Sequence, residues 1–172
     1  MSTSLILLEL PGVTGDCSIA GFAGHIALES FSWGVNSTMK IESGPKGKAN
    51  VSVKCDQLQV SKYYDSSSIQ MCNLMGKDKE FETGVILKFV DSTSLAQRAN
   101  SKFESIMEME LKKVYIENIS IRASESGKAM SVTEDVVFSM QEVALRYFLY
   151  DPVKKIRIPG NPFEWVAPKV DV

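Results

Sequence analysis

The fold of this chain is constrained most by the alternation of apolar and polar residues along segments of strand length. The alternation is clear at residues 81–89, 103–111 and 136–140. A repeat of two is that of a β-strand that buries one face and leaves the other face in solvent. The sequence therefore predicts a mainly β protein.

The alternation changes phase within three of the longer segments. The apolar positions shift by one residue after Cys55, after Leu111 and after Met140. A β-bulge inserts one extra residue into a strand, and it both produces such a shift and bends the strand. Since bending helps sheets to close into barrels, we expect a small β-barrel of two curved antiparallel sheets, with a bulge at each phase change.

One segment is typical of a helix. Asp65 and the serines after it can cap a helix, apolar residues then recur from Ile69 to Met75, and Gly76 is a suitable end. We expect one short α-helix at about residues 66–76 that flanks or plugs the barrel.

The length of 172 residues suits a single core. The barrel is predicted to span residues 1–150. Residues 151–172 contain four prolines and are too few for a domain of their own. We expect them to form a C-terminal tail that packs on the barrel or on a neighbouring subunit.

Charge and hydropathy exclude several classes of function. The net charge is −2 and no basic run is present, so the sequence does not predict a nucleic-acid binder. The longest apolar run, Leu5 to Leu8, is far shorter than a membrane span, and the first residues lack the features of a signal peptide. Three widely spaced cysteines do not suggest a disulfide framework. We expect a protein that starts in the cytoplasm and does not insert into membranes.

Residues suited to catalysis or metal binding are sparse. His25 is the only histidine, and no zinc-binding spacing of cysteine or histidine occurs, so we expect no metal site and no cofactor. Glu104, Glu108 and Glu110 share one strand face. Paired carboxylates serve glycosidases, which leaves a β-barrel hydrolase acting on carbohydrate as an alternative. The solvated side of an amphipathic strand explains the same residues more simply, and we expect no enzyme.

The strand near residue 30 has an unusual polar face. Phe31 and Trp33 alternate with Ser30, Ser32 and Gly34. The aromatic side chains are predicted to lie in the barrel core. The small polar residues must therefore face something other than a core.

Three segments are predicted to be loops, at residues 42–48, 91–102 and 124–128. The first two are longer than a hairpin needs, and loops of that length often bind a partner. We expect them to make contacts between protomers, at Gly44, Pro45, Lys46, Gly47, Lys48, Asp91 and Ser92.

Three segments in this order resemble the haemolysin co-regulated protein (Hcp) family over about residues 5–150. The first holds Phe31-Ser32-Trp33-Gly34, where the family usually has Trp-Ser-Trp-Gly. The second runs from Leu58 through Asp65-Ser66-Ser67 into the predicted helix, without the usual proline. The third runs from Glu134 to Tyr147 and is similar to the closing strand of the family, with Phe138 and Tyr147 expected in the core.

The resemblance implies a non-catalytic tube subunit of the bacterial type VI secretion system. Six copies would form a ring, and stacked rings would form a tube inside a contractile sheath and behind a spike protein. The tube would then be secreted without a signal peptide, and small effector proteins could travel in its lumen. Ser32 corresponds to a position on the lumen wall that can bind effectors, and Ser30 lies on the same face. A related tail-tube protein or a ligand-binding barrel is a further alternative.

Overall fold

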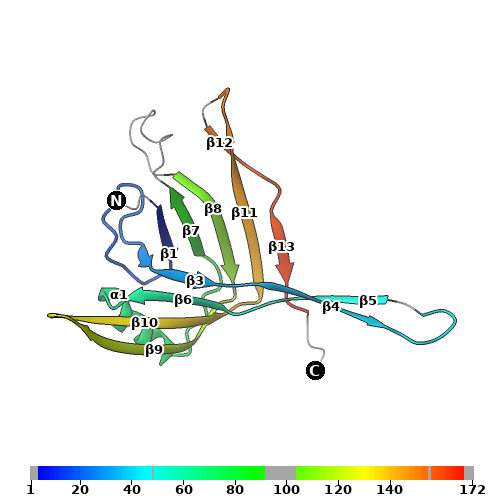
Figure 1. The fold of residues 1–172 in the computed structure, drawn as a ribbon, viewed down its shortest axis with the longest axis horizontal. Coiled ribbons are helices and arrows are strands. Elements are labelled where there is room, and N and C mark those ends of the chain that lie inside the picture. Colours follow the sequence, from blue (N-terminus) through cyan, green and yellow to red (C-terminus); the bar gives the residue numbers. More distant parts are fainter. Residues whose placement is uncertain (1–3, 48, 92–103, 155, 169–172) are drawn as a thin grey trace.

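A computed structural model describes residues 4–47, 49–91, 104–154 and 156–168 (Figure 1). The strands before the helix are β1 (Ser4–Glu9), β2 (Ile26–Leu28), β3 (Ser30–Ser32), β4 (Val35–Ile41), β5 (Ala49–Cys55) and β6 (Leu58–Tyr63). Helix α1 spans Ser66–Met75. After it come β7 (Val85–Asp91), β8 (Glu104–Lys112), β9 (Tyr115–Ser126), β10 (Ala129–Ser139), β11 (Glu142–Asp151), β12 (Ile156–Pro159) and β13 (Phe163–Val166).

The strands form two main antiparallel sheets. One has seven strands in the order β12-β11-β8-β7-β1-β2, with β13 also paired to β11, and the other has four strands in the order β3-β6-β10-β9. Strands β4 and β5 pair with each other as a two-stranded ribbon. The sequence-based prediction of a mainly β, barrel-like fold with one short helix is confirmed.

The core lies between the two sheets. Leu87 and Leu111 from the seven-stranded sheet and Leu58 and Phe138 from the four-stranded sheet are fully buried in one cluster. Helix α1 adds Met71, which is also fully buried. This cluster holds the four-stranded sheet and the helix at fixed positions relative to the seven-stranded sheet.

The helix begins and ends where the sequence predicts. Asp65 is its N-cap and accepts a hydrogen bond from the backbone N–H of Ser67, at 2.9 Å. The side chain of Ser68 in turn accepts a hydrogen bond from the backbone N–H of Asp65, at 3.1 Å, which completes a capping box. Gly76 ends the helix in a right-handed conformation.

The first of the three phase changes is a β-bulge, as predicted. Between the pairs Ser32–Gln59 and Val35–Cys55, two residues of one strand oppose three of the other. The extra residue lies at the point where the hairpin leaves the four-stranded sheet and becomes the ribbon.

At the other two phase changes the bulge prediction is wrong. The pairs Lys112–Glu142 and Tyr115–Ser139 keep one register, so no residue is inserted between them. Instead, β8 with β11 passes into β9 with β10 at a shared corner, where Lys113 adopts a left-handed conformation with φ 52°. A corner between sheets exchanges the inner and outer faces of both strands together, so it mimics a bulge in the sequence.

The residues predicted to form the core have different surroundings. Phe138 is fully buried, while Phe31 and Trp33 are half-buried and pack against the main cluster. Phe31 also makes an edge-to-face contact with Phe89, with the ring centroids 4.7 Å apart.

For Tyr147 the prediction of a core position is wrong, because 53% of its surface is exposed. Tyr147 is in phase with the buried Val143, but this part of β11 extends beyond the four-stranded sheet (Figure 1). No second layer covers it there in the described chain.

The described part of the tail lies on the barrel of its own chain. Strand β13 pairs with the first half of β11, from Glu142 to Leu145, and β12 pairs with the second half, from Phe148 to Asp151. The tail therefore occupies an edge of β11 that would otherwise expose unpaired backbone groups.

Candidate functional surface

The outer face of the four-stranded sheet is small and polar. Ser30 and Ser32 of β3 are exposed, and their cross-strand neighbours on β6 are Ser61 and Gln59. Next to these, β10 contributes Asp135 and β9 contributes Ser120 and Asn118. We call this surface the polar wall; it consists of Ser30, Ser32, Gln59, Ser61, Asn118, Ser120, Arg122, Asp135 and Val137.

Side chains of the polar wall form hydrogen bonds and an ion pair with one another. The hydroxyl of Ser61 donates to Asp135, and Arg122 forms an ion pair with the same carboxylate at 2.7 Å. The hydroxyl of Ser120 donates to Asn118 at 3.3 Å. The acidic and the basic side chain of the wall, Asp135 and Arg122, are therefore paired with each other.

The opposite face of the same sheet carries a buried ion pair that the sequence analysis did not identify. Lys62 of β6 and Glu134 of β10 lie directly across from each other and are 1% and 0% exposed. Their Nζ and Oε1 atoms are 2.7 Å apart. The second carboxylate oxygen of Glu134 is buried and has no hydrogen-bond partner among the described residues.

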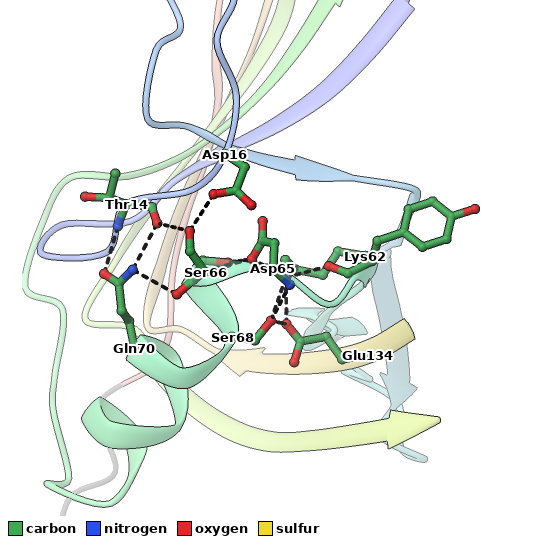
Figure 2. A network of polar contacts seen from close by, with 10 residues as sticks. Thr14, Asp16, Lys62, Asp65, Ser66, Ser68, Gln70 and Glu134 are labelled. Atoms are coloured by element: carbon green, nitrogen blue, oxygen red, sulfur yellow. Dashed lines mark hydrogen bonds and ion pairs between the residues drawn. The ribbon is translucent and has the colours of Figure 1, made fainter. Parts of the chain in front are cut away.

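This ion pair belongs to a network at the start of α1 (Figure 2). The ammonium of Lys62 also donates to Asp65 at 2.9 Å and to Ser68 at 3.0 Å, and the hydroxyl of Ser68 donates to Glu134 at 2.7 Å. One cation therefore links two carboxylates on different elements, and it ties the helix N-terminus to the inner face of the sheet that carries the polar wall.

The network changes the acidity of Asp65. Burial by itself raises the pKa of this carboxyl, but the hydrogen bond from Ser67 and the charge of Lys62 outweigh it and hold the pKa below its usual value. The helix cap is therefore ionised at neutral pH.

A second set of contacts ties α1 to the loop after β1. Gln70 accepts a hydrogen bond from the backbone N–H of Thr14 and donates one to the carbonyl of Thr14, both at 3.0 Å. Ser66 donates to Asp16 at 2.5 Å. Helix α1 is thus attached both to the sheet and to the neighbouring loop (Figure 2).

The ribbon of β4 and β5 exposes several large apolar side chains. It projects away from the two main sheets (Figure 1). Met39, Ile41 and Val51 are 60%, 71% and 62% exposed, and Val35 and Val53 are also exposed. A two-stranded hairpin is at best marginally stable alone in water. Contact of these apolar side chains with another protein surface would remove them from water and stabilise the ribbon.

The loop residues predicted to make ring contacts lie at separate places. Gly44, Pro45, Lys46 and Gly47 are exposed at the tip of the ribbon. Asp91 is the last residue of β7 and is half-buried. Lys48 and Ser92 lie outside the described residues.

The three glutamates considered for hydrolysis lie on the seven-stranded sheet. Glu104 is about half exposed and forms an ion pair with Arg157 at 3.4 Å. Glu108 has Lys88 and Arg146 as its cross-strand neighbours. Glu110 lines a shallow depression with Arg146 and Glu164. Cations thus flank Glu108 on both sides and Arg157 pairs with Glu104, an arrangement that suits a solvated sheet face.

In the part of the chain that the structure describes, no three side chains of histidine, cysteine, aspartate or glutamate are grouped closely enough to hold a metal ion. Among the same residues, no helix is long and apolar enough to cross a membrane.

Comparison with known proteins gives one consistent result. Residues 7–147 match the family model described as "Type VI secretion system effector, Hcp". A comparison with curated proteins finds no match.

Solved structures share the fold at low sequence identity. A type six secretion system protein aligns with a TM-score of 0.71 at 20% identity and covers 94% of both chains. Hcp1 from Salmonella typhimurium aligns with a TM-score of 0.64 at 19% identity, covering 91% of this chain and 92% of its own. A type VI secretion system effector from Yersinia pestis aligns with a TM-score of 0.63 at 14% identity, covering 94% of this chain and 99% of its own.

Proposed function

Since this chain belongs to the Hcp family of type VI secretion system effectors, we propose that it is a non-catalytic tube subunit that forms hexameric rings and that these rings stack into an expelled tube. The proposal is supported most directly by the exposed apolar ribbon of β4 and β5. A subunit that worked alone would gain nothing from this surface, whereas a repeating assembly would bury it.

The size of the apolar surface indicates how the ribbon would contribute. Full burial of Met39, Ile41 and Val51 would supply roughly 5–9 kcal/mol, at about 1.5–3 kcal/mol for each side chain. Association itself costs about 4–15 kcal/mol. The two ranges overlap, so the ribbon contact leaves little or no net free energy by itself, and further contacts, as in a closed ring, would add to it.

The polar wall is proposed to line the lumen of the ring. Most of its side chains are uncharged, and Asp135 is already paired with Arg122. A small effector protein could therefore rest on Ser30 and Ser32 without having to pair with an isolated charge. The proposed partners are further copies of this chain, a spike protein at the tube tip, a contractile sheath around the tube and small effectors within it.

In this proposal the protein assembles in the cytoplasm and leaves the cell as part of the tube. The exposed residues at the ribbon tip, from Gly44 to Gly47, would contact the next subunit or ring. Asp91, Ser92 and Lys48 are proposed for the same role.

Electron microscopy of the purified protein in negative stain, together with light scattering, tests the proposal. The wild-type chain should show six-fold rings at high concentration. The double variant M39S/I41S should remain monomeric, because it removes the largest exposed apolar side chains of the ribbon. The matched control is M130S, at a residue that is 74% exposed but lies on β10. A wild-type protein that stays monomeric, or a control that also loses its rings, would overturn the proposal.

A further inference from the structure

The ribbon is joined to the C-terminal strand by one specific hydrogen bond. The indole N–H of Trp165, in β13, donates to the backbone carbonyl of Val53, in β5, at 3.1 Å. The two residues are 112 positions apart in the chain. The contact therefore links β13, the last of the described strands, to the element proposed to meet a neighbouring subunit.

Trp165 is itself held firmly in place. It pairs with Val143 in the ladder between β13 and β11, and its side chain packs against the main core cluster. Just beyond it, the backbone N–H of Ala167 donates to the carbonyl of Gln141 at 2.7 Å. The indole is thus attached to the seven-stranded sheet, whereas Val53 belongs to the ribbon.

The base of the ribbon has a second, local set of contacts. The backbone N–H of Asp56 donates to the carbonyl of Gly34 at 2.9 Å, and the side chain of Asn36 donates to the Asp56 carboxylate at 2.7 Å. These bonds close the hairpin at the bulge, but they join only the two arms of the hairpin to each other. The bond from Trp165 joins the ribbon to a different sheet.

We propose that Trp165 is a positioning residue, which fixes the direction of the ribbon in the free subunit before a neighbouring copy binds. This inference rests on the proposed function, in which the ribbon contacts a second copy of the chain. A ribbon that is already held in its bound direction loses less conformational freedom on association, so assembly begins at a lower concentration. The C-terminal tail thereby acquires a role in assembly.

Trp165→Phe tests the inference, because it keeps an aromatic ring and removes the N–H donor, and the volume that it loses is the same in the control. Trp33→Phe is the matched control: Trp33 is also half-buried against the core, but its indole nitrogen has no hydrogen-bond partner among the described residues. Hydrogen exchange of residues 35–55 is measured on dilute monomer, and the threshold concentration for ring formation is measured by light scattering.

Loss of one hydrogen bond should speed exchange in the ribbon by roughly 2- to 12-fold in W165F, and the ring threshold should rise by a similar factor. W33F should match the wild type in both measurements. Equal ribbon exchange in W165F and W33F would overturn the inference even if the wild type forms rings. Faster exchange in W165F with an unchanged ring threshold would overturn the role in assembly. Absence of rings in the wild type would overturn the proposed function, and the role of Trp165 in assembly with it.

Discussion

Removal of Lys62 should destabilise this protein more than any exposed substitution. In Lys62→Met, the carboxylate of Glu134 keeps one donor, Ser68, and Asp65 loses its only cationic partner within the described network. Removing one member of a buried pair leaves an uncompensated charge and typically costs 3–5 kcal/mol. Since Glu134 is 0% exposed and one of its oxygens is already without a partner, we expect a loss of about 3–5 kcal/mol in the free energy of unfolding.

The double variant K62M/E134L separates the cost of an unpaired buried charge from the loss of packing. It removes both buried charges, so Asp65 is the one carboxylate of the network that loses its contact with Lys62. We expect a loss of about 1.5–3 kcal/mol, the value of a hydrogen bond to a charged group. The double variant should therefore be more stable than K62M, although it carries one more substitution.

Urea unfolding followed by circular dichroism provides the free energies. The control is Arg122→Met, which breaks the exposed pair with Asp135, where the two side chains are 67% and 36% exposed; its loss should be about 0.2–1 kcal/mol. The buried network does not stabilise the fold in the way we argue if K62M loses no more unfolding free energy than this control. The same holds if the loss in K62M/E134L equals the sum of the losses in K62M and in E134L.

Three further predictions concern the cap, the wall and the ribbon base. The pKa of Asp65 is lower in the folded protein than its unfolded value of about 3.9, so ionised Asp65 contributes fully to stability above about pH 3.9, and this contribution is lost as the pH falls through the folded pKa. Asp65→Asn should therefore flatten the acid branch of a plot of unfolding free energy against pH. An unchanged acid branch would refute this. Ser32→Trp should leave rings intact but reduce the yield of effector that purifies with them, whereas Ser32→Ala should not; equal yields in mass spectrometry would remove the assignment of Ser32. In Gly34→Ala the new Cβ would lie 2.9 Å from a carboxylate oxygen of Asp56, so the Asp56 side chain must move. Hydrogen exchange in the ribbon should then become faster, and rates equal to those of the wild type would refute this.

The sequence was most informative where structure depends on local spacing. The helix was predictable to within one residue, because the capping residues Asp65 and Ser68 lie just before the helix and in its first turn. The bulge near Gly34 was also predictable, since its extra residue changes the alternation. Sheet corners change the alternation in the same way, so only the strand pairing distinguishes a corner from a bulge.

The buried ion pair could have been predicted in part. Lys62 is in phase with Leu58 and Val60, and Glu134 is in phase with Val136, so alternation places both charges on the core side of their strands. A buried charge without a partner is costly, so two opposite charges in core positions are expected to pair with each other. Their direct opposition depends on the register between β6 and β10, which local patterns do not contain.

The exposure of Tyr147 and the contact of Trp165 could not have been predicted from the sequence. Tyr147 continues the alternation of a buried strand, and only the limited extent of the opposite sheet leaves it exposed. The bond from Trp165 to Val53 requires β13 and the ribbon to lie side by side. Both features depend on how distant segments are arranged in space.

The first two strands of the polar wall, β3 and β6, continue into the ribbon as one long hairpin, and this connection explains the Phe-Ser-Trp-Gly segment. On one side of the bulge, Phe31 packs into the core while Ser32 faces outward; on the other side, the ribbon has no core and exposes both faces. Trp33 lies between them and packs against the core, as Trp165 does from the C-terminal strand. The direction of the ribbon relative to the wall is therefore set at this junction, by the bulge and, through its bond to Val53, by Trp165. If the wall lines a lumen and the ribbon meets a neighbouring copy, this junction fixes the angle at which subunits follow one another around a ring.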